Sequence, residues 1–336
     1  MLFTPFSIRD LKLKNRIVMP PMCMYSAGDD GQATDWHFVH YVTRAVGQAG
    51  LIIVEATGVE EAGRISANDL GLWNDNQMES LKRIVAAVHQ AGSKIAIQLN
   101  HAGRKCEVPG LEIVAPSAIA FSKDSCQPKE LSIEEIHGIV ERFRLAAQRA
   151  VQAGFDAVEI HGAHGYLLNQ FLSPLANRRK DQYGGSPGNQ ARMLGQVVEA
   201  VRSVMPDEMP LFVRVSAHDY EAGGNTPESV AEMLNLIKNK GIDMIHVSSG
   251  AVTPAIPRAY PGYQIGFAIT VKELTGLPVI GGGLITEPLQ AERIVKADVD
   301  MVFLARELLR NPYWPLQAAN ELGVAAAWPV PYERAK

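Results

Sequence analysis

Two imidazoles and a phenol stand close together at the end of an apolar segment. His161, His164 and Tyr166 follow residues 156–160, whose sequence Asp-Ala-Val-Glu-Ile is typical of a buried strand. Side chains three positions apart on a continuous strand point to opposite faces, so the two imidazoles converge only if the chain bends between them. Gly162 allows that bend. Three polar groups gathered at a strand end predict a site that holds a substrate oxygen and moves a proton.

The composition is that of an ordinary globular protein and excludes several partners. The chain has 336 residues, of which 47% are hydrophobic and 20% are charged, with a formal net charge of -4. No basic cluster indicates a nucleic-acid partner, and no apolar run approaches the length of a membrane span. The N-terminus lacks the features of a signal peptide. The three cysteines, Cys23, Cys106 and Cys126, are too widely spaced for a disulfide framework or a zinc motif, so we expect a cytoplasmic protein without a metal.

Short runs rich in valine and isoleucine alternate with longer amphipathic runs along almost the whole chain. We expect strands at 17–22, 51–57, 94–100, 157–161, 211–216, 244–248, 278–281 and 301–305. We expect helices at 37–48, 75–90, 133–152, 190–204, 227–239, 265–274, 287–295 and 312–321. Eight such units most simply close into a (β/α)8 TIM barrel that forms a single domain over 1–336, with long loops after strands 3 and 4. An open doubly wound sheet would more often carry a GxGxxG turn after its first strand, and this chain has none there.

Barrel closure would bring the polar residues at the strand ends to one rim. The seventh strand ends in Gly281, Gly282 and Gly283, where the backbone can approach a ligand closely. The eighth strand ends at Ala305 and Arg306, and the guanidinium of Arg306 is suited to bind a phosphate. Because loops after strands seven and eight are a frequent phosphate site in TIM barrels, we predict a phosphate cradle here.

These motifs together resemble the old yellow enzyme family of FMN-dependent ene-reductases, and in particular its bacterial thermophilic-like branch. The most specific motif is His-Gly-Ala-His-Gly-Tyr at 161–166. The resemblance covers nearly the whole chain and includes residues 3–5, 13–19, 55–56, 98–104, 115–117, 161–174, 181–186, 212–216, 306–312 and 332–334. It implies an NADPH dehydrogenase with tightly bound FMN, reduced by NADPH or NADH.

The resemblance assigns the catalytic roles to His161, His164 and Tyr166. It implies that His161 and His164 donate hydrogen bonds to the carbonyl oxygen of an α,β-unsaturated substrate. Flavin N5 then passes a hydride to the β-carbon, and Tyr166 protonates the α-carbon. Two alternatives for the histidines are a buried pair satisfied within the fold and a metal site with Glu159. A zinc site would need a further ligand that the neighbouring sequence does not supply.

The resemblance also implies which residues hold the flavin. Gln98 and Arg214 should face its pyrimidine edge, where a fixed guanidinium favours the reduced, negatively charged form. The remaining residues expected to bind the cofactor are Pro21, Met22, Cys23, Ala56, Gly281, Gly282, Gly283, Ala305 and Arg306. Cys23 would place a thiol near the flavin and substrate, although a lone cysteine is more commonly an inert core residue. Tyr25 should help bind the substrate.

The C-terminal tail, residues 323–336, would ordinarily be expected to fray. In the resembling branch the terminal arginine, here Arg334, reaches the active site of a neighbouring subunit. The resemblance therefore predicts a homo-oligomer, a dimer or a homotetramer.

The leading hypothesis is an ene-reductase that acts on enals, enones, quinones or nitro compounds. Two alternatives remain at the level of the sequence, a metal-dependent barrel hydrolase and a non-catalytic flavin binder. A larger relative with an iron–sulfur cluster does not fit, because the chain lacks clustered cysteines.

Overall fold

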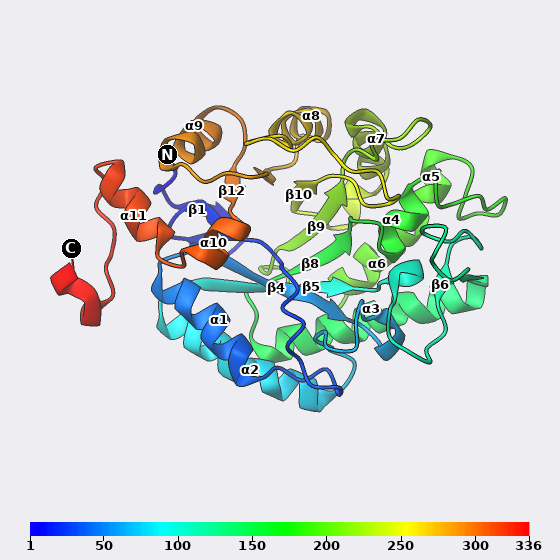
Figure 1. The fold of residues 1–336 in the computed structure, drawn as a ribbon, viewed down its shortest axis with the longest axis horizontal. Helices are drawn as coiled ribbons and strands as arrows, with labels where there is room; N and C mark the ends of the chain where they lie inside the picture. The colour runs from blue at the N-terminus through cyan, green and yellow to red at the C-terminus, as the bar shows by residue number, and fades with distance from the viewer. Residues whose placement is uncertain (336) are drawn as a thin grey trace.

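Eight parallel strands close into a barrel in the computed structural model, which describes residues 1–335 (Figure 1). Around the barrel the strands follow the order β10-β11-β12-β3-β4-β5-β8-β9, so strands consecutive in the chain are neighbours. Their bounds are β3 Ile17–Met19, β4 Leu51–Gly58, β5 Lys94–Asn100, β8 Ala157–Gly162, β9 Leu211–Ser216, β10 Met244–Ser248, β11 Val279–Gly282 and β12 Met301–Phe303. The predicted TIM barrel is therefore confirmed.

Helices surround the barrel and alternate with its strands (Figure 1). The long ones are α1 Asp35–Val46, α2 Asp75–Gln90, α3 Ile133–Ala153, α6 Arg192–Arg202, α7 Pro227–Ile237, α8 Ile265–Thr275, α9 Pro288–Ala297 and α11 Trp314–Glu321. Three shorter helices are α4 Leu167–Leu172, α5 Pro187–Gln190 and α10 Arg306–Arg310. Short 3-10 helices are η1 Glu61–Gly63, η2 Gly103–Lys105, η3 Lys238–Lys240 and η4 Val330–Ala335.

Some predicted bounds were wrong. The first barrel strand ends at Met19 rather than at residue 22, because Pro20 and Pro21 have no N–H to donate to a neighbouring strand. The helix predicted from residue 190 begins at Arg192, after the separate short helix α5.

A hairpin that the sequence reading missed closes one end of the barrel. Strands β1 (Phe6–Ile8) and β2 (Leu11–Leu13) pair antiparallel. Leu11 and Leu13 are buried in one cluster with barrel residues such as Phe212 and Met244. The alternation of apolar and polar residues in Phe-Ser-Ile and Leu-Lys-Leu was the available signal. A second small sheet, β6 (Val114–Ala115) with β7 (Lys129–Glu130), lies in the long loop after β5.

Each barrel strand is buried on both faces. Ile52 and Val54 of β4 belong to the large cluster between strands and helices, whereas Leu51 and Ile53 belong to the cluster inside the barrel. This division follows the alternation of side chains along a strand. Apolar side chains fill the interior at the end that the hairpin closes, so the polar strand-end residues are left to the opposite end.

The start of α3 carries a capping box formed by Ser132 and Glu135. Ser132 Oγ accepts from the backbone N–H of Glu135 at 3.2 Å, and Glu135 Oε2 accepts from the N–H of Ser132 at 2.8 Å. Ser132→Ala is expected to lower the free energy of unfolding by about 1 kcal/mol, measured by urea denaturation. Ser203→Ala is the control, because the exposed Ser203 hydroxyl only donates to the Ala200 carbonyl. Equal losses in the two variants would contradict the capping role.

No helix within residues 1–335 combines the length and the apolar character that crossing a membrane requires.

Candidate active site

The polar residues predicted at the strand ends lie together inside one end of the barrel. Strand pairing places His161 of β8 beside Arg214 of β9, and Arg214 beside His246 of β10. Gln98 of β5 pairs in the same way with Glu159 of β8. Residues distant in the sequence thus become neighbours because their strands are adjacent and parallel.

His161 is almost completely buried, with 3% of its surface exposed, and its proton position follows from its hydrogen bond. The backbone N–H of Ala163 donates to His161 Nδ1 at 3.2 Å. A neutral imidazole that accepts at Nδ1 carries its proton on Nε2. The His161 ring lies 5.2 Å from that of His164 and 4.9 Å from that of Tyr166, both nearly perpendicular to it. The three predicted catalytic side chains therefore converge.

His164 is held by two serines from neighbouring strands. Its backbone N–H donates to Ser216 Oγ at 2.9 Å, and its Nε2 lies 2.7 Å from Ser248 Oγ. Gln264 also donates to Ser248 Oγ, at 3.3 Å. A Ser248 hydroxyl that donates to His164 Nε2 places the proton of a neutral His164 on Nδ1.

Both imidazoles are neutral near pH 7. Burial, followed by the positive charge of Arg214, holds the pKa of His161 and the pKa of His164 well below the ordinary 6.5. Neutral imidazoles at this pH present one N–H each and carry no charge. The pair can therefore donate two hydrogen bonds to a single oxygen.

Tyr166 precedes α4 and retains its phenolic proton. Burial, followed by the influence of Cys23 and Tyr25, raises the pKa of Tyr166 far above 10. Cys23 packs with Tyr166 against the same small buried cluster, which contains Ala56 and Ala102. Burial, followed by the carboxylates of Asp69 and Glu55, also raises the pKa of the Cys23 thiol. Both groups are thus protonated at neutral pH.

The other residues predicted on this rim come from the first two barrel strands. Pro21 and Met22 follow β3, and Ala56 lies on β4 beside a register shift between Val54 and Ala56. Tyr25 has 57% of its surface exposed and a positive φ of 52°. It lies at the outer edge of the site.

A buried carboxylate that the sequence reading did not assign to the flavin site organises the barrel interior. Glu159 is fully buried and accepts from Gln98 Nε2 at 2.8 Å. Its second oxygen lies 2.8 Å from His246 Nδ1. The bond to Glu159 uses one N–H of the Gln98 amide, so the second N–H and the amide oxygen can still donate and accept.

Arg214 supplies a donor that the fold itself does not satisfy. Its Nε is buried and has no hydrogen-bond partner within residues 1–335. Burial lowers the pKa of Arg214, and the charge of Glu159 opposes that shift. A buried donor without a partner requires an explanation, and a flavin pyrimidine edge offers the acceptors that it lacks.

The predicted phosphate cradle adjoins Arg214. A cavity of about 190 Å³ is lined by Arg214, Gly283, Ala305 and Arg306 among others. Gly283 has a φ of 104°, and a Cβ there would lie 2.9 Å from the Tyr263 ring. A Cβ on Gly282 would lie 2.8 Å from the Phe303 ring. Arg306 forms no salt bridge with the described part of the chain. An acceptor edge beside Arg214 and a phosphate beside Arg306 are the two ends that FMN requires, so the residues fit this cofactor.

Arg334 is the one predicted site residue that does not join the others. It is exposed in η4, on a tail that leaves the barrel beside α11 (Figure 1).

No three His, Cys, Asp or Glu side chains in residues 1–335 are grouped to hold a metal ion, so nothing in this part of the chain supports the alternative of a metal-dependent hydrolase. The sequence reading also missed the supporting roles of Ser216, Ser248 and Gln264, for which single polar residues at strand ends were the only signal.

Comparisons with known proteins identify the family of this chain. Residues 1–324 match the model of the NADH:flavin oxidoreductase / NADH oxidase family. An NADPH dehydrogenase from Geobacillus sp. (strain WCH70) is 54% identical over 336 residues, which span 99% of this chain and 98% of that protein. Morphinone reductase superposes with a TM-score of 0.82 at 32% identity, covering 98% of this chain and 91% of its own.

A further similar structure is that of an old yellow enzyme homologue, the family that the sequence motifs resemble. The old yellow enzyme homologue from Zymomonas mobilis has a TM-score of 0.82 at 28% identity, covering 96% of this chain and 94% of that one. The match to the family model spans the predicted catalytic residues, Arg214 and the predicted phosphate cradle. The chain therefore belongs to the NADH:flavin oxidoreductase / NADH oxidase family of FMN-dependent enzymes, the family of the old yellow enzymes.

Proposed function

We propose that this enzyme takes electrons from NADPH, or from NADH, and reduces the C=C bond of α,β-unsaturated carbonyl compounds. The observation that carries the proposal is the convergence of two neutral imidazoles and a protonated phenol beside the cofactor end of the barrel. The names of the NADPH dehydrogenase relatives support NADPH as reductant. Enals, enones, quinones and nitro compounds are the acceptors we expect.

The protein's part in the reaction is to hold the substrate oxygen and deliver a proton. FMN, when bound, would supply the hydride that the substrate β-carbon accepts. His161 and His164 donate from Nε2 and Nδ1 to the carbonyl oxygen, where negative charge develops. Tyr166 then gives its proton to the α-carbon. Tyr25 contributes to the substrate-binding edge.

We infer that the cofactor is bound along the line from Arg214 to Arg306. Arg214 and Gln98 would hold the pyrimidine edge, and Arg306 with the glycines would hold the phosphate. The other residues that we expect to line FMN are Pro21, Met22, Cys23, Ala56, Gly281, Gly282, Gly283 and Ala305. As a neutral thiol, Cys23 would tune the redox behaviour of the flavin.

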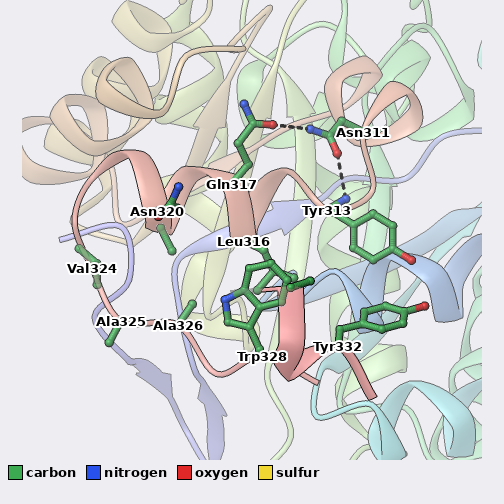
Figure 2. A pocket seen from close by; sticks show the side chains of 12 residues that line it. Asn311, Tyr313, Leu316, Gln317, Asn320, Val324, Ala325, Ala326, Trp328 and Tyr332 are labelled. Atoms are coloured by element: carbon green, nitrogen blue, oxygen red, sulfur yellow. Dashed lines mark hydrogen bonds between the residues drawn. The ribbon is translucent and has the colours of Figure 1, made fainter. Parts of the chain in front are cut away.

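We propose that residues 323–336 contact a neighbouring subunit in a dimer or tetramer and that Arg334 enters that subunit's site. Lys336 lies outside the described residues. A groove of about 770 Å³ lies between α11 and the tail, with Trp328 and Tyr332 along it (Figure 2). Arg334 is exposed on this tail, as a residue that serves another subunit would be.

We also expect a cytoplasmic location, in keeping with three free cysteines.

The test is to follow both half-reactions of the purified protein without oxygen. NADPH should bleach the yellow colour of the bound flavin, and 2-cyclohexenone should restore it with formation of cyclohexanone. Bleaching without reoxidation by any enone, quinone or nitro acceptor would contradict the proposal and leave a flavin protein with another role. Failure to retain FMN would contradict the proposed cofactor residues.

Ser248→Ala tests whether the serine sets the proton position of His164. Loss of one hydrogen bond lets His164 adopt the other tautomer, so kcat/KM for 2-cyclohexenone should fall about tenfold, which equals about 1.4 kcal/mol. The control is Ser93→Ala, which removes a buried hydroxyl that donates to the Ala49 carbonyl. Equal kinetics in the Ser248 variant and the wild type would remove Ser248 from the mechanism.

A further inference from the structure

Lys105 is a largely buried cation beside the proposed catalytic residues. It ends η2 in the loop after β5, and its Nζ donates to the backbone carbonyls of His164 at 3.0 Å and Ala251 at 3.4 Å. The ammonium lies 5.0 Å from the centre of the Tyr166 ring and 4.6 Å from that of Phe121. It forms no salt bridge with any residue in 1–335. A buried charge without an opposite charge is costly, so these neutral contacts must hold it.

The two carbonyls that accept from Lys105 belong to residues with unusual backbones. His164 has a φ of 59° and Ala251 a φ of 70°, although neither is glycine. Such conformations are unfavourable for residues other than glycine and persist only where the surroundings enforce them. The two loops also touch, because a Cβ on Gly165 would overlap the Ala251 carbonyl oxygen. The Lys105 ammonium thus binds two neighbouring loops, each of which has an unfavourable backbone conformation at the residue that accepts the hydrogen bond.

We propose that Lys105 is a positioning residue that ties the loops after β8 and β10 together and thereby fixes His164 and Tyr166 for the reaction. By binding both carbonyls, it holds the left-handed backbone that directs the His164 imidazole. The proposal rests on the roles proposed above for His164 and Tyr166.

The contact with the Tyr166 ring adds a second effect. Proton transfer breaks the O–H bond of Tyr166 and forms a C–H bond at the substrate α-carbon, which leaves a phenolate until water reprotonates it. The ammonium lies close to that ring, so it stabilises the negative charge as the charge forms. Lys105 therefore favours the proton transfer as well as the geometry.

The charge of Lys105 depends on pH within the working range. Burial, followed by the positive charge of Arg104, lowers the pKa of Lys105 to about 8, and Glu107 opposes the shift. The groups that face Lys105 from β8 and the loop after it are Tyr166 and the neutral His161 and His164. The ammonium is present below pH 8 and is lost as the pH rises through 8. We therefore expect kcat for 2-cyclohexenone to fall above pH 8 in the wild type.

The experiment compares Lys105→Met and Lys105→Arg with the wild-type holoenzyme. Lys105→Met removes the charge and the donors, so kcat for 2-cyclohexenone at pH 7 should fall about 10- to 100-fold, in line with the loss of charged hydrogen bonds. Its remaining activity should be independent of pH around 8. Lys105→Arg should restore much of the rate and also remove the decline above pH 8, because arginine remains charged there. Lys123→Met, at an exposed lysine of the same loop, should behave as the wild type.

The outcomes separate this inference from the proposed function. FMN content and the flavin spectrum establish that each variant is folded. Wild-type kcat and an unchanged pH profile in Lys105→Met would overturn the role of Lys105, even though enone reduction stands. If Lys105→Met does not fold, a decline above pH 8 that persists in Lys105→Arg would overturn it instead. Absence of enone reduction in the wild type would refute the proposed function itself.

Discussion

Tyr166→Phe is expected to lower the rate at which 2-cyclohexenone reoxidises the reduced enzyme by about 100- to 10,000-fold, the range for loss of a general acid. Reduction of the bound flavin by NADPH needs no proton from the phenol, so its rate should stay close to that of the wild type. The raised pKa of Tyr166 means that the phenol keeps its proton until a strong base, such as the substrate α-carbon, forms beside it. Stopped-flow measurement of the two half-reactions separates the two effects.

Tyr183→Phe is the matched control for this variant. Tyr183 is a buried tyrosine whose hydroxyl donates to Gln196 at 3.0 Å, outside the proposed site. Its replacement should leave both half-reactions intact even if it lowers the melting temperature. A Tyr166→Phe enzyme that reduces the enone at the wild-type rate would mean that water or another group supplies the proton.

His161→Ala and His164→Ala are each expected to lower kcat/KM for 2-cyclohexenone by about 100- to 1,000-fold, the usual effect of removing one donor to a developing oxyanion. The double variant should lose less than the product of the two, because both donors act on one oxygen. FMN should remain bound, because neither imidazole belongs to the proposed cofactor residues.

His89→Ala controls for loss of a histidine elsewhere, since His89 lies near the surface and contacts Asp156. It should leave kcat/KM unchanged. If His161→Ala and His164→Ala bound the enone normally and turned it over at the wild-type rate, the imidazoles would be buried structural residues, as the sequence alone also allowed.

The same two histidines should make the fold sensitive to acid. Their pKa values lie well below the ordinary 6.5 in the folded protein, so below pH 6.5 the unfolded chain binds protons that the folded chain does not. Their contribution is fully present above pH 6.5 and is lost as the pH falls toward the folded-state values. The melting temperature should therefore decline between pH 7 and pH 5, and the double alanine variant should decline less steeply.

Much of the barrel was readable in the sequence because its elements carry local signals. Strands β5, β9 and β10 and helix α2 have the predicted bounds, since their apolar runs end at clear polar or turn residues. The capping box at Ser132 fixed the start of α3. The hairpin β1–β2 was missed because three-residue strands are too short to stand out, although their apolar residues close the barrel.

The sequence motifs contain the residue types that the proposed reaction needs, whereas tertiary contacts decide the protonation and orientation of each side chain. The sequence by itself determined that two histidines, a tyrosine and several glycines and arginines follow barrel strands. It did not contain the bonds that set protons and orientations, because the partners lie far along the chain. Ser248 lies 84 residues from His164, and Lys105 lies 59 residues before it. Only closure of the barrel brings such residues within hydrogen-bonding distance and removes the water that would otherwise leave their pKa values unchanged.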